Sequence, residues 1–204
     1  MKKILYIHGF MSGADSETGK LLHKIYDNTI IPEVDANPTT SIEIINKAIK
    51  ENKPDIIVGS SLGGFYTLLC DSSDIPILVI NPSIKPQDTL KKCIGKELEY
   101  FCNRKDGKKT YTLTKDVYDS ISKYDAIDKA KEKKDVLWSV CSTKDDILGT
   151  THIDILERIN TDHIFKTDEI GHRLDKKFIN GYLKEIIDNI IEENSYEKGL
   201  WKIS

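Results

Sequence analysis

An apolar run in the first third of the chain breaks into the pattern Gly-x-Ser-x-Gly at residues 59–63, and an amphipathic stretch follows. A serine on such a strand-to-helix turn is held in a strained backbone conformation. Its neighbours two before and two after must lack bulk, because their Cβ atoms would collide as the chain reverses. Gly59 and Gly63 meet that need around Ser61, whereas centring the turn on Ser60 would put bulky residues at the tight positions. The pattern predicts Ser61 at the tip of a sharp turn; the alternative is a glycine-rich turn with incidental serines.

Short apolar runs recur along the chain and are separated mostly by helical patterns. We expect six strands from them: Ile4–Ile7, Thr29–Val34, Ile56–Val58, Ile77–Ile80, Val136–Val140 and His163–Lys166. Most of these runs lack strict alternation, which is typical of strands covered on both faces of a parallel sheet. A capping box at Thr40–Glu43 predicts the start of one helix, and a one-sided apolar stripe over Ile179–Ile191 predicts the last. This order predicts an α/β fold with an open, twisted, mainly parallel sheet of about six strands and helices on both faces.

At 204 residues the chain is long enough to bury one sizeable core, and we expect a single domain over residues 1–204. Residues 84 to about 125 interrupt the alternation of strands and helices, because they carry lysines and aromatics but no strong core strand. We interpret them as an excursion over the edge of the sheet, either a small lid or a mobile loop region. The tail Ser195–Ser204 is expected to fray or to be held by Trp201.

The composition and charge of the chain limit the classes of partner that it is expected to bind. Hydrophobic residues make up 39% of the chain and charged residues 31%, and the net charge of -3 gives no general attraction to nucleic acid or anionic lipid. No apolar run approaches the length of a membrane span, and Ile4–Ile7 is too short for a signal peptide. The four cysteines lack C-x-x-C spacing, so we expect reduced thiols and a cytoplasmic protein. No metal or cofactor motif is found, and the oligomeric state is left open.

Ligands of open α/β sheets gather at the carboxyl ends of the strands. The first predicted strand ends in His8-Gly9-Phe10, where a glycine lets the backbone pass close to the turn that carries the serine. We expect the N–H of Phe10 and the N–H of Leu62 to form an oxyanion hole. The side chain of His8 is expected to bond loop backbone rather than to move protons.

A carboxylate is needed after the fifth strand, to fix the tautomer of a catalytic histidine and to stabilise the imidazolium. Asp145 and Asp146 both stand there, and Asp145 is favoured because the hydrophobic pair Ile147 and Leu148 follows. The alternatives are that Asp146 is the acid, or that both acids only cap the next helix near Thr150.

The third member is expected to be His172, which follows Gly171 after the sixth strand. This placement agrees with the chain order serine, aspartate, histidine that characterises the architecture. The other candidates fit less well, because His23 and His152 fall in predicted helices and His163 opens the sixth strand at the wrong end of the sheet.

Four further residues are predicted to contact substrate. Met11 and Tyr66 flank the turn, Asn81 ends the fourth strand, and Arg173 follows the candidate histidine. For Asn81, turn formation alone is a sufficient explanation. The aromatics of the excursion are expected either to contact an acyl chain or to hold the excursion down: Tyr100, Phe101 and Tyr111.

With these residues in place, the chain resembles α/β-hydrolases that begin directly at the oxyanion strand. More narrowly it is similar to the YqiA-like family of small bacterial esterases, to which the Asn-Pro-x-x-x-Pro segment points. The resemblance rests on five stretches spread over nearly the whole chain: Tyr6–Phe10, Gly59–Tyr66, Asn81–Pro86, Lys144–Leu148 and Gly171–His172. Lys144 and Arg173 depart from the residues common in relatives, which bears on substrate preference more than on chemistry.

The resemblance implies an α/β-hydrolase fold and esterase activity on short acyl esters, with thioesters as a further substrate class. We therefore predict a serine hydrolase that acts through Ser61, Asp145 and His172 and an acyl-enzyme. The alternatives are a thioesterase or acyltransferase on the same scaffold, and a catalytically silent homologue that acts as a binding module.

Overall fold

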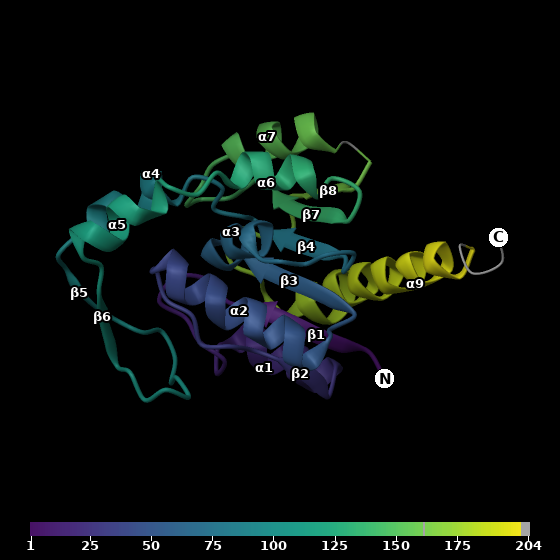
Figure 1. Ribbon diagram of the computed structural model, residues 1–204, viewed down its shortest axis with the longest axis horizontal. Helices are drawn as coiled ribbons and strands as arrows, with labels where there is room; N and C mark the ends of the chain where they lie inside the picture. Colours follow the sequence, from purple (N-terminus) through teal and green to yellow (C-terminus); the bar gives the residue numbers. More distant parts are fainter. Residues whose placement is uncertain (161, 201–204) are drawn as a thin grey trace.

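Six parallel strands form the central sheet, in the order β2-β1-β3-β4-β7-β8 (Figure 1). Their bounds are β1 Lys3–Ile7, β2 Asn28–Ile30, β3 Ile56–Ser60, β4 Ile77–Ile80, β7 Leu137–Ser142 and β8 Ile164–Thr167. Every neighbouring pair in this sheet runs parallel. The computed structural model describes residues 1–160 and 162–200, so Trp201 lies outside the described residues.

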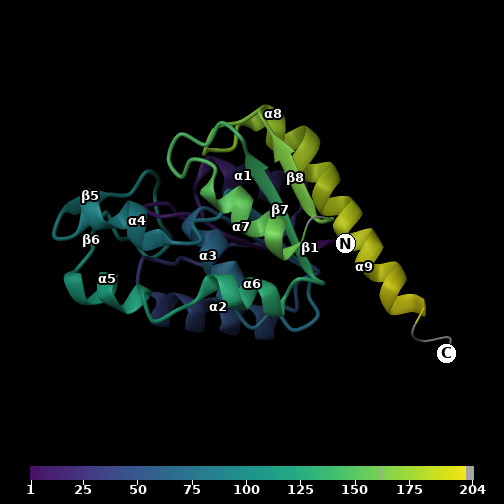
Figure 2. The ribbon, with the colours of Figure 1, turned by 90° about the horizontal axis from the view of Figure 1, so that it is seen from above.

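Helices cover both faces of the sheet, which confirms the predicted fold class (Figure 2). The helices are α1 Glu17–Ile25, α2 Pro38–Asn52, α3 Leu62–Leu69, α4 Pro86–Leu90, α5 Lys115–Ile121, α6 Ala126–Glu132, α7 Thr151–Ile159, α8 Lys176–Phe178 and α9 Lys184–Leu200. One core joins the sheet to α2, α3, α6 and α7, and a second core joins its other face to α1 and α9. Successive strand residues serve the two cores in turn, since Leu5 faces the first and Ile4 the second.

The second strand and the helix α2 differ from their predicted bounds, and the ends of the other strands shift by two residues at most. The second strand ends at Ile30 rather than at Val34, because this edge strand pairs with β1 at only three positions and the chain beyond it bonds other segments. Helix α2 begins at Pro38 rather than near Thr40. The side chain of Asn37 caps it by accepting the Thr39 N–H at 3.1 Å, and proline suits the first helical position because its φ is already helical.

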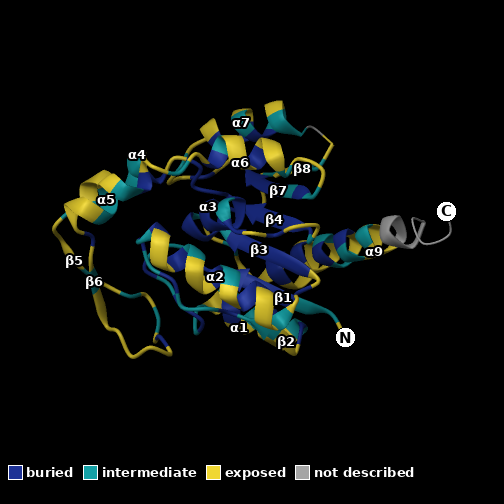
Figure 3. Ribbon diagram, in the orientation of Figure 1, coloured by how far each residue is buried: buried dark blue, intermediate teal, exposed yellow. Residues whose placement is uncertain are grey.

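Residues 84–125 lie beside the sheet and join the first core through Ile84, Leu90, Leu113 and Ile121. They contain α4, a short 3₁₀ turn at Lys91–Cys93, an antiparallel hairpin of β5 Glu97–Glu99 and β6 Thr110–Thr112, and α5. Figure 3 shows this hairpin largely exposed, in contrast to the buried strands of the central sheet. The predicted lid role and the predicted single domain remain predictions.

In the part of the chain that the structure describes, no helix combines the length and the apolar character needed to cross a bilayer.

Candidate active site

Ser61 sits directly between β3 and α3, with the strained backbone angles φ 54° and ψ -120°. Its N–H donates to the Ile80 carbonyl of the adjacent strand at 3.0 Å, which holds the turn against the sheet. A Cβ on Gly63 would collide with the carbonyl oxygens of Ile7 and His8, and one on Gly59 would collide with Thr67. The sharp turn therefore forms where the glycine pattern predicts it, for the predicted steric reason.

The structure brings the serine, histidine and aspartate together from segments far apart in the sequence. The Oγ of Ser61 lies 2.9 Å from Nε2 of His172, and Nδ1 of His172 lies 2.8 Å from Oδ2 of Asp145. The side chain of Asp145 is fully buried and that of His172 is 8% exposed. This geometry allows the imidazole to accept the serine proton while the carboxylate faces its other nitrogen.

The two neighbouring acids have different contacts. The Oδ1 of Asp145 accepts the N–H groups of Ile147 and Leu148 at 2.9 and 2.7 Å, which leaves Oδ2 for the histidine. The Oδ1 of Asp146 instead accepts the backbone N–H of His172 at 3.1 Å. Asp145 thus contacts the imidazole, whereas Asp146 holds the loop on which the imidazole stands.

Asp145 is arranged to be ionised at neutral pH. Burial opposes its negative charge, but the hydrogen bond with His172 and those from the two N–H groups outweigh it, so the pKa of Asp145 lies below its ordinary value of 3.8. An ionised carboxylate at this place favours the tautomer of His172 that carries its proton on Nδ1.

The side chain of Asn81 makes contacts other than the predicted one with substrate. Its side chain is fully buried, its Nδ2 donates to the carbonyls of Gly171 and His172, and its Oδ1 accepts the N–H of Ser142. These contacts tie the ends of β4 and β7 to the histidine loop and leave no surface for a substrate. The structure argues against the predicted substrate contact and assigns Asn81 to the support of His172.

The side chains of the other three predicted substrate-contact residues differ in how far they are exposed. Tyr66 is fully buried and donates its hydroxyl to the Asp35 carbonyl at 2.8 Å, so the structure argues against its predicted contact too. The side chain of Met11 is also buried, at 4% exposure. Arg173 is exposed and places its guanidinium 4.9 Å from the ring centre of Phe101.

The loop after β1 lies against the serine. A Cβ on Gly9 would be 3.2 Å from the Cβ of Ser61 and 3.7 Å from its Oγ, so the backbone of Gly9, next to Phe10 in the chain, packs against the nucleophile. Among the described residues, no hydrogen-bond acceptor occupies the N–H of Phe10 or the N–H of Leu62. The ring of His8 is buried and contacts backbone at both nitrogens, the carbonyl of Gly9 and the N–H of Val34.

Two of the other histidines have separate places: His23 is in α1, and the ring of His163 stacks on Trp138 with centres 3.8 Å apart. His152 in α7 is buried close enough to Asp145 and His172 to interact with their charges, and burial lowers its pKa. Over residues 1–160 and 162–200, no three side chains of the metal-ligating types cluster as a cation site.

Comparison with protein families gives a match over residues 3–189 to the family described as "Uncharacterised protein family (UPF0227)". The chain belongs to this family. The match spans the whole central sheet, the hairpin, and Ser61, Asp145 and His172.

Several solved structures resemble this UPF0227 chain. Est1E from Butyrivibrio proteoclasticus with ferulic acid bound is 14% identical with a TM-score of 0.73, covering 94% of this chain and 90% of that chain. A monoacylglycerol lipase from Paleococcus ferrophilus is 14% identical with a TM-score of 0.63, covering 93% of each chain. The esterase domain of a Rhodothermus marinus protein is 14% identical with a TM-score of 0.63, covering 91% of this chain and 84% of that chain. At such identities the likeness shows the α/β-hydrolase fold alone.

Proposed function

We propose that the chain is a serine esterase that hydrolyses short acyl esters, with Ser61 as nucleophile, His172 as general base and acid, and Asp145 as the residue that orients His172. The observation that carries this proposal is the pair of contacts Ser61 Oγ to His172 Nε2 at 2.9 Å and His172 Nδ1 to Asp145 Oδ2 at 2.8 Å. The strained turn supports it further, because such strain persists in proteins mainly where function uses it.

The reaction begins when Ser61 Oγ attacks the ester carbonyl while His172 Nε2 accepts the hydroxyl proton. The negative charge that develops on the carbonyl oxygen is stabilised by the N–H groups of Phe10 and Leu62, and each well-aimed donor contributes roughly a hundred- to a thousandfold in rate. His172 then gives the proton to the leaving alcohol oxygen, which departs and leaves an acyl-serine. Water attacks the acyl-serine with His172 again as base, and the acid and the free serine are released.

Small ester substrates are supported by the kinds of protein that share the fold, which include a monoacylglycerol lipase and an esterase domain. The exposed Arg173 and Phe101 are the side chains that we assign to substrate contact. A thioester or an acyl acceptor other than water would use the same nucleophile. A panel of p-nitrophenyl esters and acyl-CoA thioesters, with and without an added alcohol, distinguishes these reactions.

The test is hydrolysis of p-nitrophenyl butyrate by the wild-type chain and by Ser61→Ala. We expect Ser61→Ala to lose at least about ten-thousandfold in kcat, as removal of a nucleophile does in other serine hydrolases. Ser60→Ala is the matched control, because it deletes the hydroxyl of the neighbouring residue. That hydroxyl is hydrogen-bonded to the Tyr6 hydroxyl at 2.8 Å, and the variant should keep the wild-type turnover.

A fluorophosphonate probe gives a second readout that needs no knowledge of the natural substrate. We expect the wild type and Ser60→Ala to be labelled and Ser61→Ala to remain unlabelled. Turnover and labelling that survive in Ser61→Ala would refute the assignment, and an unlabelled wild-type chain would identify a silent homologue.

A further inference from the structure

Arg104 is an unusual residue in the exposed hairpin, because its guanidinium is buried. It stands in the loop between β5 and β6, yet its side chain is only 1% exposed, a state that arginines rarely adopt unless their charge is paired. Nothing in the proposed chemistry uses it.

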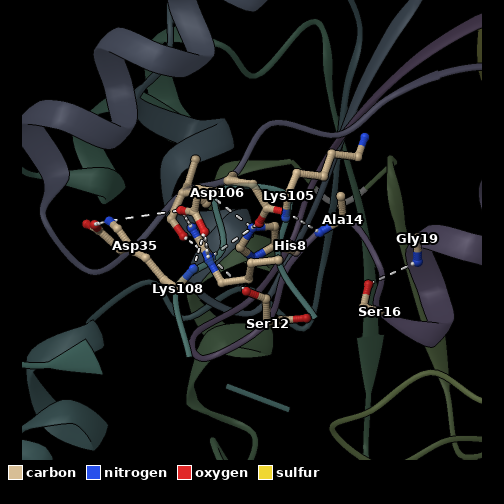
Figure 4. A network of polar contacts seen from close by, with 12 residues as sticks. His8, Ser12, Ala14, Ser16, Gly19, Asp35, Lys105, Asp106 and Lys108 are labelled. Atoms are coloured by element: carbon tan, nitrogen blue, oxygen red, sulfur yellow. Dashed lines mark hydrogen bonds and ion pairs between the residues drawn. The ribbon is translucent and has the colours of Figure 1, made fainter. Parts of the chain in front are cut away.

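The guanidinium joins three segments of the chain. Its Nε and Nη2 donate to the two carboxylate oxygens of Asp106 at 3.0 and 2.7 Å, a bidentate pair that fixes the plane of the group. Its Nη1 then donates to the carbonyls of Ser12 at 2.9 Å and Val34 at 3.0 Å. Figure 4 shows Ser12 and Asp106 gathered in this network with His8 and Lys105.

The carboxylate of Glu33 also connects the hairpin with the loop after β1. Its Oε1 accepts the N–H of Ala14 at 3.2 Å and the N–H of Lys105 at 2.8 Å, and its Oε2 lies 3.3 Å from Nη1 of Arg104. Burial disfavours the charge of Glu33, but its contacts with His8, these N–H groups and Arg104 outweigh that effect, and the pKa of Glu33 is lowered. A buried ion pair thus joins the hairpin to the segment after β2, and Glu33 also binds the loop from Gly9 to Ala14 through the N–H of Ala14.

That loop depends on these contacts for its shape. Met11 has φ 57°, a strained value that persists only when the surroundings impose it. The N–H of Phe101 in the hairpin donates to the Met11 carbonyl at 2.9 Å, and Arg104 holds the next carbonyl, that of Ser12. A Cβ on Gly13 would be 2.9 Å from Cγ of Arg104, so the arginine stem lies directly on the loop.

We propose that Arg104 is a positioning residue for the proposed esterase reaction: from the inserted hairpin it fixes the loop from Gly9 to Ala14, whose Phe10 N–H is the oxyanion donor. This inference rests on the proposed function. It gives residues 84–125 a role that differs from that of a lid, because the hairpin builds one wall of the site instead of opening above it. Phe10 itself also contacts this region, edge-on to the ring of Tyr111 with centres 6.4 Å apart.

The kinetic signature follows from where the donor acts. A poorly aimed N–H weakens stabilisation of the transition state but hardly affects ground-state binding. We expect Arg104→Met to lower kcat for p-nitrophenyl butyrate about tenfold or more, with KM changed less than about twofold. The inhibition constant of a short-chain trifluoromethyl ketone, whose hemiketal oxyanion would use the same donors, should rise by the same factor.

Arg104→Met alone leaves the charge of Glu33 buried without its partner, which can unfold the protein. The double variant Glu33→Gln with Arg104→Met removes both charges and keeps an acceptor for the N–H groups of Ala14 and Lys105. We expect it to fold and to show the same loss in kcat and the same rise in the inhibition constant. Lys105→Met is the matched control, since it makes the same change in the next, exposed side chain, and it should behave as wild type.

Three outcomes would overturn the inference. If wild-type turnover does not depend on Ser61, the proposed function fails and the inference fails with it. If wild-type turnover depends on Ser61 but the folded double variant keeps wild-type kcat, the esterase stands and Arg104 has no positioning role. The same conclusion follows if the double variant raises KM and leaves the inhibition constant for the ketone unchanged.

Discussion

The two sides of the candidate site are held by different forces. Ser61 and Asp145 follow β3 and β7, which flank β4, and the apolar residues of these three strands are buried apart from the partly buried Trp138. His172 follows the less buried edge strand β8, and its loop is held by Asn81 and Asp146. The hairpin side stands on β5 and β6, whose residues are exposed or half-buried. The loop between them is attached to the body by Arg104 and its partners, while Leu113 after β6 is buried in the first core.

This difference matters because burial of apolar surface is insensitive to pH and salt, whereas charged contacts depend on the ionisation of each partner. The strands that carry Ser61 and Asp145 are therefore expected to keep their arrangement over a wide range of conditions. The loop that carries the Phe10 N–H is expected to loosen when the charges of the hairpin are lost. Three measurements test this comparison.

Asp145→Asn should have the largest effect, and it should fall on activity alone. The amide keeps the size of the carboxylate but cannot stabilise the imidazolium of His172, and the same change in a serine protease costs about ten-thousandfold in kcat. We expect a loss of that order with p-nitrophenyl butyrate and a thermal unfolding curve close to that of the wild type. If Asp145→Asn keeps a tenth of the wild-type rate, Asp145 does not have the proposed role in the reaction.

Glycine-to-alanine substitutions on the two sides should differ in their cost to stability. The Cβ of Gly63→Ala would collide with backbone at the end of β1, and we expect a loss of about 3 kcal/mol or more in the free energy of unfolding. Gly107 in the hairpin loop has φ 76° and open space where a Cβ would stand, so Gly107→Ala should cost only about 1 kcal/mol of backbone strain. Urea unfolding measures both, and equal losses would contradict the contrast between the two sides.

Acid should weaken the contacts of the hairpin with the loop after β1, because it protonates Glu33. We expect this to be the smallest of the three effects. The pKa of Glu33 in the folded chain is below its ordinary value of 4.5, so its contribution to stability is complete above about pH 4.5 and is lost as the pH falls through the lower, folded value. Hydrogen exchange of the Phe101 N–H, which donates to Met11, reports this locally.

Glu33→Gln is the comparison for that experiment. Since glutamine does not titrate, the variant should show less acid dependence of Phe101 exchange than the wild type. Equal acid dependence in the two chains would show that other carboxylates, Asp106 among them, carry the effect, because the pKa of Asp106 is also lowered by its hydrogen bonds with Arg104.

Sequence reasoning was most accurate where short segments decide the structure. The strained turn at Ser61 follows from glycines two residues to each side, and the parallel strands follow from apolar runs without alternation. It was less accurate at element ends, where distant partners compete. The strand expected to reach Val34 stops at Ile30 because Val34 bonds His8 and Arg104 instead.

Residue roles were harder to predict than residue positions. Asn81 and Tyr66 stand next to the site in the sequence pattern, yet both side chains are buried and satisfied by backbone groups. No local pattern distinguishes a polar side chain that faces a ligand from one that faces a loop, because the difference depends on which segment packs above it.

By itself, the sequence determined the sheet of parallel strands, the serine turn and the order of the three polar residues along the chain. The strands and the turn depend on sterics and hydrophobic periodicity within about ten residues, and the order of the three polar residues is read directly from their positions in the chain. Only the tertiary structure decided that Asp145 rather than Asp146 contacts the imidazole and that Arg104 of the hairpin reaches the loop after β1. Those contacts join residues that are 26 or more positions apart, and whether such charges meet is settled by how the intervening elements pack.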